Sequence, residues 1–213
     1  MLGLPVYLRN DVHLLGLVEK RKYLPEKWDD LIFVAIRTGI GSIVYHHGKA
    51  MRGQKGNAGF LGHTIMNPHG SRCCCGNYGC LETYAGQTAI VNAYNACTHG
   101  REDFEEVLQR AQAGENTARR ILEDAGFYFG VALANMIKTF EIPNVVVNCK
   151  AELAQGPFME AAQRAMTRYS TASLSLDTTM VMSQLLEEEY ALGGCYLVFE
   201  HMISKPKLAL TLS

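Results

Sequence analysis

The sequence lacks an excess of charge of either sign. Its 213 residues include 20 lysines and arginines against 21 aspartates and glutamates, for a formal net charge of −1. A nucleic-acid-binding module would carry a basic surplus, and a disordered chain would combine high net charge with few apolar residues. Because 48% of the residues are hydrophobic, the composition excludes both classes. The length allows one large globular domain or two small ones.

Long hydrophobic runs are also missing. The longest apolar stretches, such as LIFVAI at 31–36, fall far short of the roughly 20 residues that a membrane-spanning helix needs. The opening residues MLGLPVYLRND show no basic stretch followed by an apolar core, which is the pattern of a secretion signal. We therefore expect a cytoplasmic protein that makes no contact with a membrane.

Cysteines, in contrast, are plentiful and clustered. Four of the seven lie within eight residues, which are Cys73, Cys74, Cys75 and Cys80. An odd, clustered count without a secretion signal favours a reducing compartment and a metal site over disulfides. An upstream histidine, His63, completes the pattern H-x9-C-x-C-x4-C.

This spacing predicts a structural zinc site. Three cysteines and one histidine, here Cys73, Cys75, Cys80 and His63, form a common closed tetrahedral zinc site, and thiolates favour zinc over magnesium or calcium. The ion would hold the long Gly-rich loop at 50–86 in place. In an extended stretch Cys74 points away from its neighbours, so we expect it not to be a ligand. The alternative is a set of ordinary thiols in a Cys-rich turn.

Hydrophobic periodicity predicts a mixed α/β domain. Apolar β-branched runs indicate strands, and apolar residues at helical spacing indicate amphipathic helices. Strands come first along the chain, with 31–49 forming a hairpin, and helices then alternate with strands, which is typical of an α/β fold with a mixed sheet. The expected strands are 4–8, 31–38, 42–49, 144–149 and 178–183, and the expected helices are 11–22, 88–96, 102–112, 117–140, 157–169 and 188–203.

The cysteine segment resembles a known family motif. GHTIMNPHGSRCCCGNYGCLETYA at 62–85 is similar to the zinc motif of the ROK family of repressors, open reading frames and sugar kinases. Segments 9–19, 38–59 and 191–199 resemble further segments of that family, so the resemblance covers nearly the whole chain. The zinc motif is matched by Gly62, His63, Cys73, Cys75, Gly76, Gly79, Cys80, Leu81 and Glu82.

The resemblance implies a ribonuclease-H-like (actin-like ATPase) fold. Family members have two domains with a sugar bound between them, and residues 1–213 match only the second. We therefore expect a single C-terminal ROK domain, with helices on both faces of a mixed sheet and a zinc-pinned loop. The family's N-terminal phosphate-loop domain, and the winged helix of its repressors, would lie outside this sequence.

The resemblance also implies a sugar site. Asn10 and Asp11 match a sugar-contacting Asn-Asp pair, and in the kinases that aspartate is the general base toward the sugar hydroxyl. His63 would bind zinc through one ring nitrogen and face the sugar with the other, and Glu82 would accept hydrogen bonds from sugar hydroxyls. Without the resemblance, Asn10 and Asp11 read as a helix N-cap.

Two departures from the family pattern bear on function. Phe60 stands where the family has a sugar-binding glutamate, and Asn148–Cys149 stands where it has a Gly-Gly pair beside the nucleotide. We therefore expect no enzyme, but the part of a transcriptional regulator that binds a sugar or amino-sugar effector. DNA would be bound by a domain outside this chain.

Three further expectations follow from the same comparison. The alternative function is the C-terminal half of a sugar kinase that uses ATP and Mg²⁺, and a third reading is a zinc-stabilised remnant without a ligand. The last helix is apolar over much of its surface and in the family packs on the N-terminal domain. We therefore expect a homodimer or larger assembly that forms through this helix or through a neighbouring patch.

Overall fold

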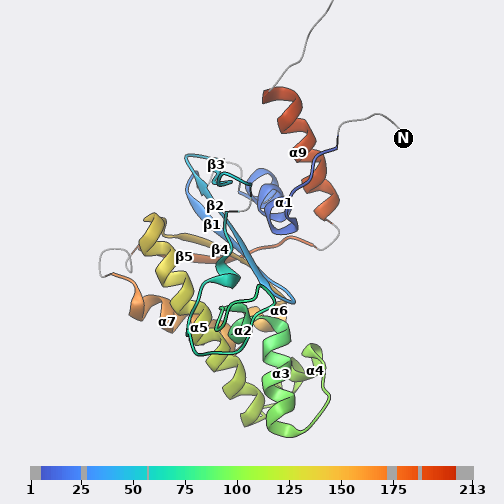
Figure 1. Cartoon of the computed structure of the whole chain (residues 1–213), viewed down its shortest axis with the longest axis vertical. Coiled ribbons are helices and arrows are strands. Elements are labelled where there is room, and N and C mark those ends of the chain that lie inside the picture. The colour runs from blue at the N-terminus through green and yellow to red at the C-terminus, as the bar shows by residue number, and fades with distance from the viewer. Residues whose placement is uncertain (1–5, 25–27, 57, 172–176, 187–188, 205–213) are drawn as a thin grey trace, which may run out of the picture.

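A five-stranded mixed sheet with helices on both faces forms the centre of the computed structural model (Figure 1). The structure describes residues 6–24, 28–56, 58–171, 177–186 and 189–204. The strand order is β3-β2-β1-β4-β5. The predicted α/β class with a mixed sheet is thereby confirmed.

The strands follow the predicted hairpin and the two later apolar runs. The hairpin pairs β1 and β2 antiparallel, from Leu31 opposite Tyr45 to Ile36 opposite Ile40. The later strands β4 and β5 add to the other edge of β1 in parallel. The bounds are β1 Leu31–Ile36, β2 Ile40–His46, β3 Lys49–Ala50, β4 Asn144–Asn148 and β5 Thr179–Met182.

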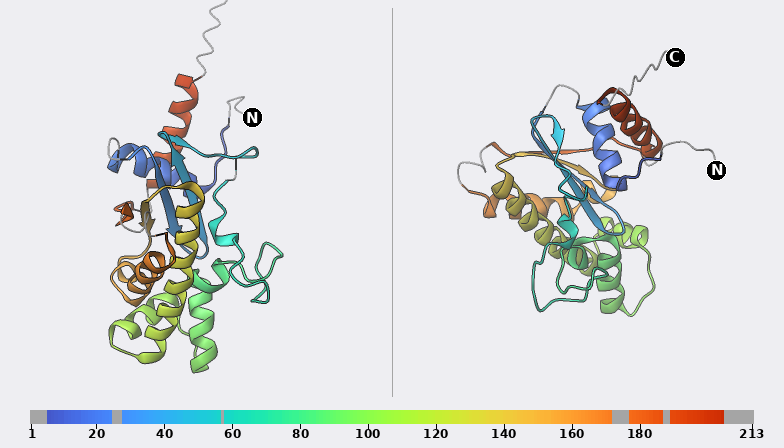
Figure 2. Two further views of the ribbon diagram at one scale, coloured as in Figure 1. Left: turned by 90° about the vertical axis from the view of Figure 1, so that its left-hand side faces the viewer. Right: turned by 45° about the horizontal axis from the view of Figure 1, so that its top comes forward.

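The helices form two layers. Helices α1 and α9 lie side by side on one face of the sheet, and α5 and α7 cover the other, with α3 and α4 beyond the sheet's end (Figures 1 and 2). The bounds are α1 Asp11–Val18, followed by a π-helical turn at Glu19–Tyr23, α2 Glu82–Ala85, α3 Gln87–Thr98, α4 Phe104–Gln112, α5 Asn116–Phe140, α6 Ala151–Ala154, α7 Pro157–Tyr169 and α9 Tyr190–Ser204. Among the described residues, no helix combines the length and hydrophobicity that crossing a membrane requires.

The prediction of a strand at 4–8 is wrong for residues 6–8, which is the part that the structure describes. Residues 6–8 have no regular structure, while residues 4 and 5 lie outside the described residues, as does residue 188 of the last predicted helix. Val6 and Leu8 are 82% and 85% exposed, because the segment joins no edge of the described sheet. Apolar content alone does not make a strand without a partner for its hydrogen bonds.

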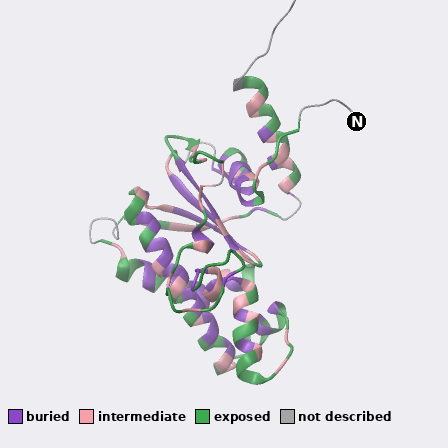
Figure 3. Cartoon of the chain, in the orientation of Figure 1, coloured by how far each residue is buried: buried purple, intermediate pink, exposed green. Residues whose placement is uncertain are grey.

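Strand β1 separates two hydrophobic cores. Ile32, Val34 and Ile36 face the core formed with α3, α4, α5 and α7. Leu31 and Phe33 face the smaller core formed with α1 and the segment leading to α9. All six residues of β1 are buried (Figure 3), as expected for a central strand covered on both faces.

Glycines bring helices into backbone contact on both faces. A Cβ atom at Gly126 or Gly130 of α5 would lie 2.0 or 2.2 Å from a carbonyl oxygen of α7. On the opposite face, a Cβ atom at Gly193 of α9 would lie 2.6 Å from the Leu14 carbonyl oxygen of α1. These helix pairs therefore pack too closely for any side chain between them.

The α5–α7 contact gives the first prediction. Gly130→Ala should lower the free energy of unfolding by about 1–3 kcal/mol, because the added methyl group has to push two backbones apart. Gly194→Ala in α9 is the control, since no atom lies within 4 Å of the new Cβ, and it should be neutral or stabilising by up to ~1 kcal/mol. Urea unfolding measures both, and equal stability of the two variants would contradict the packing.

Candidate functional site

A cavity of about 300 Å³ lies where the N-terminus of α1 meets the loop after β1. Asn10 and Asp11 line it from α1, Phe60 and His63 from the loop at 58–63, and Glu82 from the start of α2. The four residues that the resemblance assigns to sugar contact thus surround one cavity, although they lie up to 72 positions apart in the sequence.

The first two of these residues also begin helix α1. Asn10 is the N-cap, and its Oδ1 accepts a hydrogen bond from the Val12 backbone N–H at 3.0 Å. Asp11 Oδ1 accepts from the same N–H at 2.8 Å. The N-cap interpretation therefore describes the local geometry, and the cap fixes both side chains at the cavity wall.

Glu82 lies between the cavity and the cysteines. Its Oε1 accepts hydrogen bonds from the thiols of Cys73 and Cys74 at 3.2 and 3.1 Å and lies 3.6 Å from His63 Nδ1. A Cβ atom at Gly39 would lie 2.7 Å from Glu82 Oε2. Gly39, in the loop after β1, therefore leaves room for this carboxylate. The contact between Glu82 and Cys74 could not be predicted from the sequence.

The structure brings His63, Cys73, Cys75 and Cys80 together. One ligand atom from each lies within 4.8 Å of the others. His63 Nδ1 is 3.5 Å from Cys73 Sγ, and Cys75 Sγ is 3.6 Å from Cys80 Sγ. A tetrahedral zinc ion with ordinary bond lengths requires ligand-to-ligand distances of about 3.5–3.8 Å. Two of the six distances match this geometry and all lie within 4.8 Å, so the four donors are close enough together to hold such an ion.

The backbone between the ligands makes this convergence possible. Gly76 and Gly79 have φ values of +94° and +67°, in the region that favours glycine. A Cβ atom at Gly79 would lie 1.6 Å from the Asn67 carbonyl oxygen. Burial raises the pKa of the Cys73 and Cys80 thiols, so a bound cation would have to displace their protons.

Both departures from the family pattern have visible consequences. Phe60 is 57% exposed at the cavity, and its ring centroid lies 5.8 Å from that of His63. Asn148, at the end of β4, is only 4% exposed. Its Oδ1 accepts from Arg37 Nη2 at 2.9 Å and its Nδ2 donates to Ser183 Oγ at 3.2 Å. No local sequence pattern indicates this network, because its members come from the ends of three separate strands.

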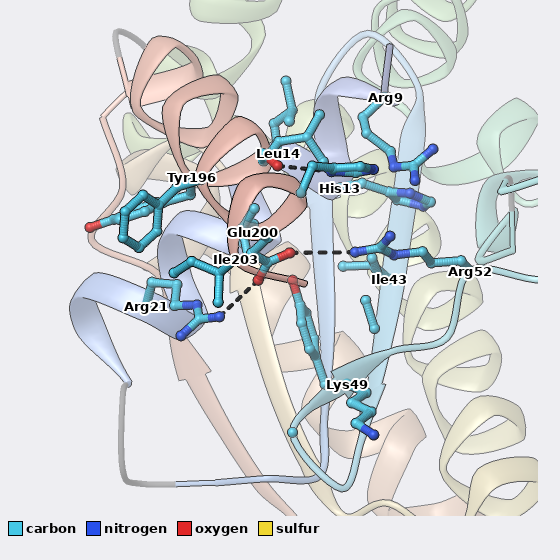
Figure 4. A pocket seen from close by; sticks show the side chains of 17 residues that line it. Arg9, His13, Leu14, Arg21, Ile43, Lys49, Arg52, Tyr196, Glu200 and Ile203 are labelled. Atoms are coloured by element: carbon cyan, nitrogen blue, oxygen red, sulfur yellow. Dashed lines mark hydrogen bonds and ion pairs between the residues drawn. The ribbon is translucent and has the colours of Figure 1, made fainter. Parts of the chain in front are cut away.

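A larger cavity of about 840 Å³ lies between α1, the β2–β3 hairpin and α9 (Figure 4). Its walls carry an ion-pair bridge in which Glu200 contacts Arg21 at 2.9 Å and Arg52 at 3.4 Å. His13 lines both cavities and hydrogen-bonds through Nε2 to the Ala58 carbonyl oxygen at 3.0 Å. Burial lowers the pKa of His13, which favours the neutral ring.

The curated relatives of this chain include repressors that are named after sugars. The chain is 27% identical over 220 residues to the xylose repressor of Caldicellulosiruptor bescii, covering 97% of this chain and 55% of the relative. It is 26% identical over 207 residues to the DNA-binding transcriptional dual regulator NagC of Escherichia coli K12, covering 93% and 51%. The chain thus spans about half the length of the curated relatives it matches.

Solved structures with the same fold include an enzyme and a regulator. The ROK hexokinase of Thermus thermophilus superposes with a TM-score of 0.80 at 29% identity, covering 93% of this chain and 67% of that one. A ROK family transcriptional regulator, a homologue of the E. coli MLC protein, superposes with a TM-score of 0.83 at 27% identity, covering 93% and 52%. The model of the ROK family matches residues 1–201. With nearly its whole length matched, this chain belongs to the ROK family.

Proposed function

We propose that this chain is the sugar-effector-binding part of a ROK transcriptional regulator. The observation that carries the proposal is the buried side chain of Asn148 at the end of β4. The family's kinases have glycines there, which let a nucleotide approach the backbone. Moving the buried Asn148 amide aside would break its hydrogen bonds with Arg37 Nη2 and Ser183 Oγ, which is costly for a buried amide. The repressors among the relatives support the same conclusion.

The smaller cavity supports a monosaccharide or amino-sugar as the effector. Its volume of about 300 Å³ is at the lower end of the range for ligand sites. Asn10, Asp11 and Glu82 offer oxygen acceptors for hydroxyl groups, and His63 offers a ring nitrogen. Phe60 replaces one expected carboxylate with an aromatic face, on which the apolar side of a sugar ring can pack.

We further propose that His63, Cys73, Cys75 and Cys80 hold one structural zinc ion. When bound, the ion would cross-link the two ends of the loop between residues 63 and 80. Glu82 follows the last ligand by two residues, so the same cross-link would fix Glu82 at the cavity. His63 Nδ1 is the ring nitrogen near Cys73, which leaves Nε2 for the sugar side.

The zinc proposal predicts about one equivalent of zinc per chain. Elemental analysis should find it in the purified protein, and Cys75→Ser should lower the content because a closed site needs all four ligands. Cys97→Ser is the matched control, since Cys97 is exposed on α3, away from the cluster. A folded wild type without metal would refute the site, and so would equal zinc loss in both variants.

The effector proposal predicts saturable sugar binding. Calorimetry with xylose, glucose and N-acetylglucosamine should find binding by at least one of them. Asp11→Asn and Glu82→Gln should each weaken it by roughly tenfold or more, because each removes a charge-assisted hydrogen bond. Asp124→Asn, on the exposed side of α5, should bind like the wild type. Absence of binding at millimolar sugar would overturn the proposal.

The alternative function is the C-terminal half of an ATP-dependent sugar kinase. The exposed carboxylate of Asp11 lines the cavity, and the Thermus hexokinase shares the fold; both observations support this alternative. With ATP, Mg²⁺ and sugar, we expect no ADP release above the buffer rate. If ADP release depends on sugar and Asp11→Asn abolishes it, the chain belongs to a kinase and the regulator proposal is wrong.

We also propose that the chain self-associates through α9. The helix exposes Phe199, Met202 and Ile203 at 61%, 66% and 63%. Phe199 and Ile203 also line the larger cavity, and exposed apolar patches of this kind mark interaction surfaces. Light scattering should find a dimer or larger assembly that Phe199→Ser weakens. Phe127→Ser, at an exposed phenylalanine of α5, should leave the mass unchanged. A monomeric wild type would contradict the proposal.

A further inference from the structure

Two histidines and an aspartate meet at the open end of the β1–β2 hairpin. The smaller cavity lies at the opposite end, beside the turn between the two strands. The β1–β2 ladder begins with Leu31 opposite Tyr45, so one step further places Asp30 opposite His46. The carboxylate Oδ1 of Asp30 lies 2.7 Å from His46 Nδ1. This carboxylate–imidazole pair fixes the orientation of the His46 ring.

An unusual turn adds the second imidazole. Adjacent residues of an extended strand point to opposite faces, which would separate His46 from His47. The turn between β2 and β3 instead places His47 at φ +50° and Gly48 at φ +70°. The two imidazole centroids therefore lie 4.0 Å apart, and the His47 backbone N–H donates to Asp30 Oδ1 at 2.9 Å.

The three side chains offer a donor set for a metal. One ligand atom from each of Asp30, His46 and His47 lies within 4.8 Å of the others, and both rings are exposed. Imidazole nitrogen with carboxylate oxygen suits borderline cations such as Zn²⁺, Ni²⁺ and Cu²⁺ rather than Mg²⁺ or Ca²⁺. The exposure leaves coordination positions for water.

The charges around the three side chains balance, and Asp30 supplies the negative ligand. Hydrogen bonding by the His47 N–H lowers the pKa of the Asp30 carboxyl, so the group is ionised at pH 7. A second carboxylate, that of Asp29, is 3.3 Å from Lys20 Nζ, and a Cβ atom at Gly48 would lie 3.2 Å from its Oδ1. Lys20 offsets one of these two negative charges. Lys49, which comes directly after the turn, adds a second positive charge.

We propose that Asp30, His46 and His47 form a second metal site, distinct from the cysteine cluster, for one divalent transition-metal ion. The ion would join the start of β1 to the β2–β3 turn, so it would fasten the exposed edge of the sheet. Neither the zinc motif nor the sugar cavity uses any of these three residues.

Nickel provides the test, since it can be titrated into the protein after its zinc content has been measured. Calorimetry should find one Ni²⁺ ion per chain, and the paramagnetic ion should broaden the NMR signals of Asp30, His46 and His47. His46→Gln and His47→Asn should each weaken binding by roughly tenfold or more. Asparagine tolerates positive φ, so His47→Asn keeps the turn while removing the imidazole.

His99→Asn is the matched control. His99 is also an exposed histidine in the left-handed region, at φ +57° after α3, but it belongs to none of the described candidate metal clusters. It should bind nickel like the wild type. The proposal is overturned if the wild type binds no nickel beyond its cysteine cluster, if His46→Gln and His47→Asn bind as tightly as the wild type, or if His99→Asn weakens binding equally.

Discussion

The side chains of β1 alternate between two hydrophobic cores, and the candidate sites described above lie at the two ends of that strand. Because both faces of β1 are buried, its register against β2 and β4 is fixed, since a slip by one residue would exchange the two cores. At its start, Asp30 meets the turn that carries His46 and His47. At its end, the loop with Gly39 leaves room for Glu82. One buried strand thus positions the candidate ligand residues at both of its ends.

The sequence could predict those features that depend on local pattern. The hairpin, the long α5 and the approach of His63 to the cysteines all follow from apolar periodicity or ligand spacing, and the structure contains each of them. The strand expected at 4–8 failed because a strand depends on a neighbour that no local pattern reveals. The residues that line the smaller cavity were predicted only from the family resemblance. Positions 10 and 82 are too far apart in the sequence for their spacing to indicate a contact.

The remaining features depend on contacts between distant segments. The network around Asn148 joins residues from the ends of β1, β4 and β5, so no sequence window contains it. The pairing of His46 with His47 was hidden for a different reason. A strand pattern predicts that neighbours diverge, and only the left-handed conformation of His47 brings the rings together. Fold is shared here between a hexokinase and a regulator, so function has to be argued from such local differences.

The close contact between α1 and α9 has a mechanical consequence. Gly193 of α9 lies against the backbone and the Cβ atom of Leu14 of α1, and Gly193 has no side chain of its own that could absorb a displacement by changing rotamer. A displacement of α1, whose first turn forms a wall of the small cavity, would therefore require α9 to move with it. The small cavity and the exposed apolar residues of α9 thus lie on two helices that are in direct contact.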